Sequence, residues 1–449
     1  MTSIKESLLN IYDDIISHKA KIAVYGLGQV GSSIAAVWLR KGASVIGIDK
    51  SDYIINEANN GFPNSNEPGV KEAFTEAIKE NRFIAIKDGI LASKESRIKF
   101  VAVPLVTNGS SIDYSDIEEV ADSIGKGLKK NDIVCFNTSL PPGTTENIIL
   151  PKLKYNGLKP DEDFALIYNP ERIYIGRAIK DIEENYPAIV SGIGNNSKAI
   201  AKELYSIIAK KGVIVMSSIK AAELEKLLEG VYRDVNIALA NELARLCDKL
   251  GIDFWEVRDA ANSQPYCNIH RAGVGVGGIC IPIYPRFVLD VASKVKEEAN
   301  IIHSSRIVND SMPEYCVDQA INMLNGKKRV AILGLAFRGN VADARLSPSY
   351  NIINKFLEYG FDIILHDPYV REESIPKNVK FTRDINTAIR NADLLFIATD
   401  HDEYKRLDED YIISINDNVM IYDGRGIFAN KEFKRLKIRG IGRAYETMV

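Results

Sequence analysis

Apolar runs alternate with polar, helix-like stretches along the first two hundred residues of the chain. Residues 21–50 begin with an apolar run, pass through a glycine turn and a helical stretch that ends near Gly42, and close on a second apolar run. This pattern is typical of one β-α-β unit. Further strands are predicted at 100–103, 133–137 and 164–168, with a helix at 114–128. The alternation predicts a mostly parallel sheet with helices on both faces, in a domain that extends over residues 1–215.

A long helical pattern follows this domain. Apolar residues recur at steps of three or four, at Leu224, Leu227, Val231, Val235, Leu239, Leu243, Leu246 and Leu250. One helix over 218–250 would be about 50 Å long. A helix of this length with a broad apolar stripe favours a connecting helix that carries a homodimer interface. The alternative is a helix packed between two domains of one chain. With further helices predicted at 254–262 and 285–311, residues 216–312 form a central helical domain.

The alternation of strands and helices restarts near Gly326. Strands are predicted at 329–333, 361–365, 394–398 and 419–422, with a helix at 347–359. The predicted fold class is therefore α/β. It comprises two Rossmann-like doubly wound parallel-sheet domains, 1–215 and 313–449, joined by the long helix and the central helical domain.

Composition and charge narrow the range of partners. The net charge of -3 gives no electrostatic reason to expect nucleic acid or an anionic membrane. No apolar run approaches the roughly 20 residues that a membrane span needs, so we expect a cytoplasmic protein. Ile4, Leu8, Ile11 and Ile15 predict a short amphipathic N-terminal helix rather than a signal peptide. The five cysteines are widely spaced, which supports neither a disulfide framework nor a metal site.

A dinucleotide-binding fingerprint opens the first domain. Gly26, Gly28 and Gly31 follow a predicted strand and begin a helix, and Asp49 ends the next strand 18 residues beyond Gly31. The glycines allow a tight turn and close approach of a pyrophosphate, while the carboxylate accepts hydrogen bonds from a ribose hydroxyl. Asp49 favours NAD over NADP, a preference that the adjacent Lys50 moderates. The predicted cofactor-binding residues are Gly26, Gly28, Gln29, Val30, Gly31, Asp49, Val103 and Thr138.

A second glycine-rich segment surrounds Cys280. The run from Gly275 to Pro282 can continue neither a helix nor an ordinary strand, and its glycines allow a ligand to approach the backbone closely. In a chain with a dinucleotide fingerprint, the leading hypothesis is a thiol that forms a covalent intermediate during nicotinamide-dependent oxidation. The alternative is a buried free cysteine beside a tight turn.

Together these motifs resemble one family. They are the fingerprint, Glu67-Pro68-Gly69, the segments TSLPPGTT from Thr138 and NPER from Asn169, the helix AAELEKLLEGVYRDVNIALANELA, the Cys280 loop, and GLAFRGNVADARLSP from Gly334. In this order they resemble the nucleotide-sugar 6-dehydrogenases of the UDP-glucose/GDP-mannose dehydrogenase family, above all the branch acting on UDP-N-acetylmannosamine and UDP-N-acetylglucosamine. The resemblance implies that the six-carbon hydroxyl of a UDP-hexose, UDP-N-acetylmannosamine by expectation, is oxidised twice with two NAD to give a uronic acid.

The resemblance also implies catalytic roles. Cys280 would attack the aldehyde to form a thiohemiacetal, whose oxidation gives a thioester that water hydrolyses. Lys226 would stabilise the developing oxyanion, Glu171 would act as general base, and Thr138 would hold a water. The alternatives are a solvated Lys226 on a helix face and a Glu171 that pairs with Arg172.

Substrate contacts follow from the same motifs. Arg271 would meet the diphosphate, and the loop glycines would bring backbone N–H groups to the sugar. Phe337, Arg338 and Arg345 match a stretch near the nucleotide and the partner subunit, although solvated arginines are common. The predicted substrate-binding residues are Glu171, Arg172, Lys226, Arg271, Gly275, Gly277, Gly278, Phe337, Arg338 and Arg345.

The chain departs from the family pattern close to the cysteine. Gly230 stands where relatives have asparagine and Tyr284 where most have aspartate; Ile279 and Ala342 are further departures. These changes put both oxidations and the hydrolysis in question. Three alternatives to the expected reaction stay open: a UDP-glucose 6-dehydrogenase, a catalytically impaired nucleotide-sugar or NAD binding paralogue, and a hydroxyacid dehydrogenase. The layout of a hydroxyacid dehydrogenase requires neither the Cys280 loop nor a second α/β domain.

Overall fold

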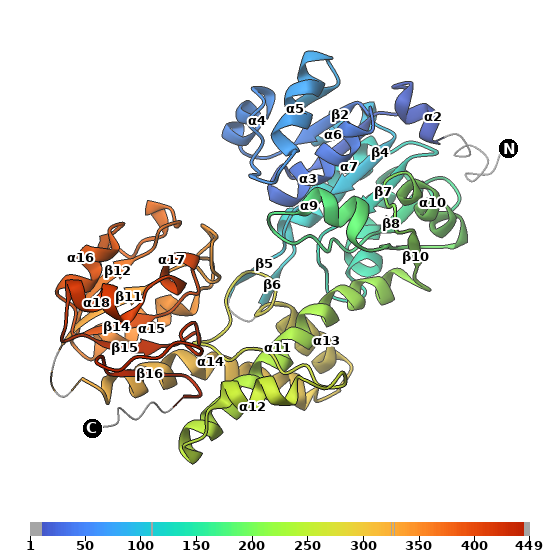
Figure 1. Ribbon diagram of the computed structural model, residues 1–449. Coiled ribbons are helices and arrows are strands. Elements are labelled where there is room, and N and C mark those ends of the chain that lie inside the picture. Colours follow the sequence, from blue (N-terminus) through green and yellow to red (C-terminus); the bar gives the residue numbers. More distant parts are fainter. Residues whose placement is uncertain (1–10, 109–110, 325, 327, 444–449) are drawn as a thin grey trace. The chain divides into compact units, whose positions relative to one another are not determined.

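The computed structural model describes residues 11–108, 111–324, 326 and 328–443 (Figure 1). The chain divides into two compact units, Met1–Leu228 and Glu229–Val449.

An eight-stranded sheet forms the centre of the first unit. Its strand order is β10-β9-β8-β7-β4-β1-β2-β3. The strands span β1 Ile22–Tyr25, β2 Val45–Ile48, β3 Phe83–Ile86, β4 Ile98–Val101, β7 Ile133–Phe136, β8 Ala165–Tyr168, β9 Ala188–Gly192 and β10 Val213–Val215. All neighbours pair in parallel except β8 and β9, which pair antiparallel. The predicted, mostly parallel sheet is confirmed, and the reversal at β9 was not foreseen. A short antiparallel hairpin, β5 Val106–Asn108 and β6 Ser111–Asp113, was also missed.

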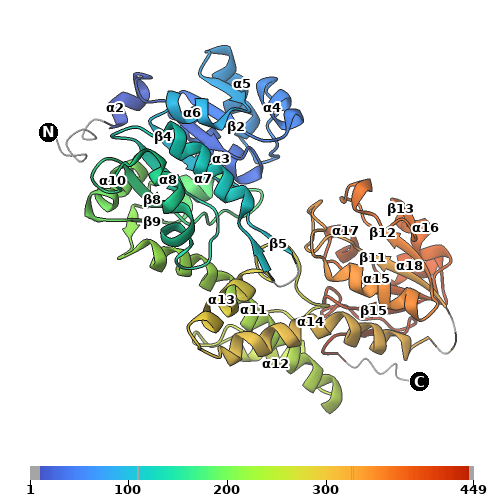
Figure 2. The same ribbon diagram turned by 180° about the vertical axis from the view of Figure 1, so that it is seen from behind.

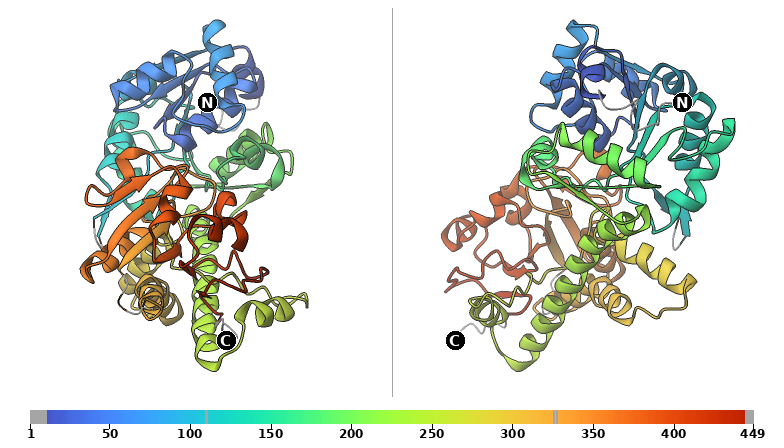
Figure 3. Two further views of the ribbon diagram at one scale, coloured as in Figure 1. Left: turned by 60° about the vertical axis from the view of Figure 1, so that its left-hand side comes forward. Right: turned by 90° about the vertical axis from the view of Figure 1, so that its right-hand side faces the viewer.

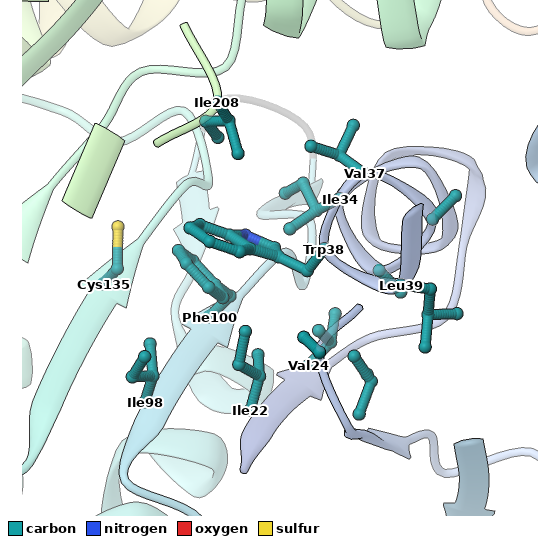
Figure 4. Close-up of a cluster of buried hydrophobic side chains, with 14 of the residues drawn as sticks. Ile22, Val24, Ile34, Val37, Trp38, Leu39, Ile98, Phe100, Cys135 and Ile208 are labelled. Atoms are coloured by element: carbon teal, nitrogen blue, oxygen red, sulfur yellow. The ribbon is translucent and has the colours of Figure 1, made fainter. Parts of the chain in front are cut away.

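Helices cover both faces of this sheet (Figure 1). On one face lie α3 Gln29–Arg40, α5 Val70–Lys79, α9 Ala178–Lys180 and α10 Asn195–Ser206; on the other lie α6 Gly89–Glu95, α7 Ser115–Gly127 and α8 Leu150–Leu153. The core of the first face centres on Trp38, which stacks on Phe100 with ring centroids 5.5 Å apart (Figure 4). The helix α2, Ile11–Ile16, buries Ile11 and Ile15 as the N-terminal pattern predicted. Ile4 and Leu8 lie outside the described residues.

The second unit contains a six-stranded, fully parallel sheet. Its order is β13-β12-β11-β14-β15-β16, and the strands span β11 Arg329–Leu333, β12 Asp362–His366, β13 Lys380–Thr382, β14 Leu394–Ile397, β15 Met420–Asp423 and β16 Ile438–Gly440. Its helices are α15 Pro348–Glu358, α16 Ile385–Arg390, α17 Asp402–Lys405 and α18 Glu409–Ile415. The order repeats the order of the first six strands of the other sheet, which is the doubly wound nucleotide-binding arrangement. The prediction of a second Rossmann-like domain is confirmed.

The predicted long helix is present, whereas one other predicted helix differs from the structure. The long helix α11, Ile219–Leu250, is continuous (Figure 3), and α12 spans Phe254–Ala261. The single helix predicted over 285–311 is wrong. Two helices, α13 Tyr284–Lys294 and α14 Asn300–Ile321, are separated by a break in which Lys296 and Ala299 adopt positive φ angles of 62° and 47° (Figure 2). No glycine marks this break, so the usual sequence signal of a left-handed helix cap was missing.

Across the described parts of the chain, we find no helix both long and apolar enough to span a membrane.

Candidate active site

The glycine turn between β1 and α3 is shaped by close backbone contacts. Gly26 has a φ of 87°, and a Cβ placed on Gly31 would lie 1.8 Å from the carbonyl oxygen of Gly26. Only glycine therefore fits at position 31. By contrast, a Cβ on Gly28 would meet no atom within 4 Å. Gly28 thus faces open space in front of the turn, where a pyrophosphate approaches in this class of site.

The acid at the end of β2 is held beside this turn. Asp49 is half-buried, and its Oδ2 accepts a hydrogen bond from Leu27 N at 2.9 Å while Oδ1 accepts from Ser51 N at 3.0 Å. The neighbouring Lys50 forms an ion pair with Asp116 at 2.8 Å, and this pairing raises the pKa of Lys50. Asp116 thereby partly neutralises the charge of Lys50, the residue expected to moderate the preference for NAD over NADP. The residues present fit NAD, because a carboxylate at the end of β2 lies beside the glycine turn.

Glu67 is a site residue to which sequence reasoning assigned no role. This buried carboxylate accepts hydrogen bonds from Gln29 Nε2 at 2.9 Å, from Gly176 N at 2.8 Å and from Ala178 N at 2.9 Å. It therefore ties the nucleotide turn to the segment that follows Glu171. Its motif, Glu67-Pro68-Gly69, was visible in the sequence, but partners more than a hundred residues away were not.

Three further predicted residues follow neighbouring strands. Val103 comes after β4, Thr138 after β7 and Glu171 after β8, so all lie at the carboxyl edge of the sheet, as Gly26 does. Thr138 Oγ1 donates its proton to the Val103 carbonyl at 2.7 Å, which leaves the hydroxyl oxygen as an acceptor only. The structure thus brings Val103 and Thr138 together.

Glu171 and Arg172 occupy the loop beyond β8. The half-buried Glu171 carboxylate accepts a hydrogen bond from the Ile173 N–H. Arg172 lies over the ring of Tyr186 at 4.7 Å from its centroid and donates to the Pro187 carbonyl. These contacts anchor Arg172 to the segment before β9.

The start of α11 carries two buried ionisable side chains. Lys226 is 8% exposed, and Glu223 is fully buried one turn earlier. Glu223 accepts hydrogen bonds from Gly143 N at 2.5 Å, Thr145 N at 2.8 Å and Thr145 Oγ1 at 2.6 Å, and so docks the TSLPPGTT segment on the helix. Burial raises the pKa of Glu223 to about 7, although the hydrogen bonds from Thr145 and Gly143 act in the opposite direction.

In the second unit, the cysteine loop packs against the segment after β11. A Cβ on Gly277 would lie 2.7 Å from Phe337 Cβ, and one on Gly278 would lie 3.0 Å from the Phe337 ring. The Gly278 N–H donates to the Arg345 carbonyl at 3.0 Å. The glycines therefore allow the two segments to meet, a packing reason that was not predicted. Gly275, with a φ of 123°, lies against Pro348 and the Asn309 carbonyl.

Cys280 is half-buried at the end of this loop, and Arg345 is close enough to interact with it electrostatically. Arg345 forms a bidentate ion pair with Asp343, which raises the pKa of Arg345, and Cys280 adds to this rise. Arg338, on the same segment, is half-buried. The structure thus gathers Cys280, Phe337 and Arg345, which sequence analysis placed in one site.

A cluster of arginines lies around Arg271, which precedes the loop in the chain. Arg271 stacks on Trp255 at 4.7 Å from the ring centroid and donates to the Gly426 carbonyl at 3.1 Å. Burial lowers the pKa of Arg271, and the neighbouring cations Arg258 and Arg425 lower it further. Cations gathered in this way favour an anionic ligand such as a diphosphate. Arg258 and Arg425 were not predicted, because residues far apart in the sequence meet only in the fold.

The second sheet differs from the first where a ribose would bind. Asp367, at the end of β12, corresponds to Asp49, but it is fully buried and contacts His401 Nε2 at 3.2 Å. Its Oδ2 also accepts from Leu335 N at 2.8 Å and Ala336 N at 2.9 Å. The carboxylate is enclosed by protein, so the NAD site belongs to the first unit. Among the residues with described positions, no group of three His, Cys, Asp or Glu side chains is arranged to hold a metal ion.

These features define an NAD-dependent dehydrogenase of nucleotide sugars, an oxidoreductase with an NAD-binding unit and a second α/β unit beside a cysteine loop. Family models agree: the NAD binding domain matches residues 20–209, the central domain 220–311 and the UDP binding domain 331–430. The chain belongs to the UDP-glucose/GDP-mannose dehydrogenase family.

Individual relatives span almost the whole chain. The UDP-N-acetyl-D-mannosamine dehydrogenase of Methanocaldococcus jannaschii is 31% identical over 430 residues, which cover 92% of this chain and 93% of the relative. The solved UDP-D-ManNAc dehydrogenase of Pyrococcus horikoshii has a TM-score of 0.86 at 29% identity, covering 94% of this chain and 99% of that chain. The NDP-N-acetyl-D-galactosaminuronic acid dehydrogenase of Methanosarcina mazei has a TM-score of 0.82 at 30% identity, covering 99% of this chain and 98% of that chain.

Proposed function

We propose that this enzyme oxidises the six-carbon hydroxyl of UDP-N-acetylmannosamine to the uronic acid, with two NAD consumed per sugar. The observation that carries the proposal is the glycine loop of Cys280, which packs against Phe337 and donates a hydrogen bond from Gly278 N to the Arg345 carbonyl at 3.0 Å. The names of the relatives from Methanocaldococcus jannaschii and Pyrococcus horikoshii support an acetamido sugar as the substrate.

In the proposed reaction, NAD when bound supplies the hydride acceptor for each oxidation. Glu171 takes the proton of the hydroxyl, and the Lys226 ammonium stabilises negative charge on the substrate oxygen. The Cys280 sulfur then forms a C–S bond to the aldehyde carbon, whose oxygen gains a proton, and oxidation of this thiohemiacetal gives a thioester. Water breaks the C–S bond and releases the carboxylate, a proton and the free thiol. Thr138 Oγ1 can accept a hydrogen bond from this water, because its own proton is committed to Val103.

The remaining predicted residues bind the two ligands in this proposal. Gly26, Gly28, Gln29, Val30, Gly31, Asp49 and Val103 hold NAD. Arg271 binds the diphosphate through the face of its guanidinium group that Trp255 and Gly426 leave accessible. Arg172, Gly275, Gly277, Gly278, Phe337, Arg338 and Arg345 complete the proposed sugar and nucleotide site.

A homodimer is part of the proposal. Apolar side chains along α11 are exposed in the monomer, at 46% for Leu228, 60% for Tyr232, 49% for Leu239, 50% for Leu246 and 60% for Leu250. Their steps of four or seven residues place them along one stripe of the helix. A contiguous apolar stripe supports burial against a second copy of the chain. The division into 1–215, 216–312 and 313–449 and the cytoplasmic location stay predictions.

The test is an assay of NADH release against a panel of UDP-hexoses, with product analysis by mass spectrometry. We expect two NADH per UDP-N-acetylmannosamine and a uronic acid product. Cys280→Ala should abolish acid formation, whereas the matched control Cys267→Ala, a half-buried cysteine outside the loop, should not.

Each alternative gives a different result in this assay. Release of one NADH with accumulation of aldehyde contradicts the four-electron reaction. Turnover of UDP-glucose alone supports a UDP-glucose 6-dehydrogenase. Tight UDP-sugar binding without NADH, measured by calorimetry, supports a catalytically impaired binding protein, an outcome to which the departures at Gly230 and Tyr284 lend weight.

A further inference from the structure

Gly230 and Tyr284 are in direct contact. A Cβ on Gly230 would lie 2.5 Å from Tyr284 Cδ2 and 3.2 Å from both Cβ and Cγ of that ring. Gly230 is buried, and Tyr284 is 6% exposed. The aromatic ring therefore lies flush against the bare backbone of α11, in a space that any larger residue at 230 would occupy.

A glycine at this point of a helix requires compensation. Gly230 is the one glycine among the 32 residues of α11, and a glycine in a helix interior destabilises the helix by comparison with alanine. The contact with Tyr284 supplies the compensation, because the missing Cβ allows the ring to approach the backbone and to bury its surface. The two unusual residues are thus two halves of one packing arrangement.

Tyr284 is also coupled to the cysteine through the backbone. Tyr284 N donates to the Cys280 carbonyl at 2.9 Å, and Ile283 N donates to the same oxygen at 3.1 Å. These bonds close a helical turn, so residues 280 and 284 lie one turn apart on the same face. A ring held on α11 at position 284 therefore sets where the Cys280 turn lies against that helix.

Lys226 precedes Gly230 by one turn on the same face of α11. The Tyr284 ring thus contacts the same helix that carries the proposed catalytic lysine. We propose that Tyr284, seated on Gly230, is a positioning residue that clamps the Cys280 turn onto α11. The expected effect of this clamp on kcat rests on the proposed function. Its expected effects on Cys280 reactivity and on stability do not.

The first test measures the reactivity of Cys280 and does not require catalytic activity. The rate of Cys280 alkylation by iodoacetamide is followed by peptide mass spectrometry in the full-length protein, with Cys267 as the internal reference. Gly230→Ala, which displaces the ring, and Tyr284→Ala, which removes it, should each change the Cys280 rate by on the order of tenfold and leave Cys267 unchanged. Tyr284→Phe keeps the ring and should restore the original rate. Arg286→Ala, an exposed control on α13, should have no effect.

A double-mutant cycle tests whether the two residues act as a pair. Gly230→Ala should lower the melting temperature by roughly 5 °C in the native background. In the Tyr284→Ala background it should leave the melting temperature unchanged or raise it slightly, because the Cδ2 atom at 2.5 Å is then absent and alanine favours the helix over glycine. Additive effects of the two substitutions, or a Cys280 rate that no variant changes by more than twofold, would overturn the clamp. If Tyr284→Phe changes the Cys280 alkylation rate as much as Tyr284→Ala does, the clamp is also overturned, because the effect then belongs to the hydroxyl group.

The third test measures kcat and KM. In an enzyme that turns over a UDP-hexose, Tyr284→Ala should lower kcat by on the order of 10²-fold with little change in KM, because a misplaced nucleophile slows chemistry more than binding. Rescue of kcat by Tyr284→Phe is expected alongside. An unchanged kcat with an altered alkylation rate would show that the clamp exists but does not serve the reaction. A lack of turnover in the native protein contradicts the proposed function and leaves the alkylation test intact.

Discussion

Replacement of Gly31 by alanine should damage the first unit far more than replacement of Gly28, although both glycines belong to the same fingerprint. At position 31 the new Cβ would lie 1.8 Å from the Gly26 carbonyl oxygen, while real Cβ contacts essentially never fall below 3.0 Å. Backbone must therefore move by at least 1.2 Å, the difference between these two distances. Overpacking of buried positions costs about 1–3 kcal/mol, and a collision with backbone lies at the upper end.

Gly28→Ala is the matched control. No atom lies within 4 Å of the added Cβ, and Gly28 has a φ of -67° and a ψ of -171°, which alanine adopts without strain. Its stability should therefore stay within about 0.5 kcal/mol of the native protein. The added methyl group nevertheless occupies the space in front of the turn, so NAD affinity should fall by about tenfold or more.

Thermal unfolding and NAD titration separate the two variants. A loss of about 3 kcal/mol corresponds to a fall of roughly 6–12 °C in the transition of a unit of this size. Gly31→Ala should show this fall, and Gly28→Ala should melt like the native protein but bind NAD weakly by calorimetry. If Gly31→Ala melts within 2 °C of the native protein, or Gly28→Ala binds NAD normally, the geometry assigned to this turn is wrong.

Three further outcomes follow from the structure. Asp132→Asn should lower the free energy of unfolding by about 3–5 kcal/mol in denaturant titrations, because it leaves the buried Lys99 ammonium without its carboxylate at 2.5 Å. Asp122→Asn, which breaks a solvent-accessible ion pair with Lys126, should cost less than about 1 kcal/mol. The pKa of Glu223, raised by burial from 4.5 to about 7, favours the protonated folded state, so its contribution to stability is complete below pH 4.5 and is lost as the pH rises to about 7. Melting curves across this range should show a decline of up to about 3 kcal/mol relative to Glu223→Gln, and parallel curves would contradict the assignment. Finally, Leu239→Glu should convert the proposed homodimer to a monomer in analytical ultracentrifugation, because it places a charge on the exposed apolar stripe of α11. A monomeric native protein would exclude the α11 interface.

Some elements of the fold and site could be predicted because their signals are local. The fingerprint glycines, the acid at the end of β2 and the 32-residue helix α11 are each encoded within a few turns or strands of continuous sequence. Patterns of this kind can be recognised without knowledge of the tertiary structure. The break between α13 and α14 was missed for the converse reason, since Lys296 and Ala299 take left-handed conformations that their side chains do not signal.

By itself, the sequence determined the class of fold, the NAD turn and the presence of a cysteine in a glycine-rich segment, because hydrophobic periodicity and glycine spacing act through neighbouring residues. Only the tertiary structure decided that Gly230 and Tyr284 form one contact, that Glu67 joins the nucleotide turn to a distant loop, and that Arg258, Arg271 and Arg425 gather around one site. These arrangements depend on close packing and on charges brought together across long stretches of chain. Such contacts exist only once the chain has folded.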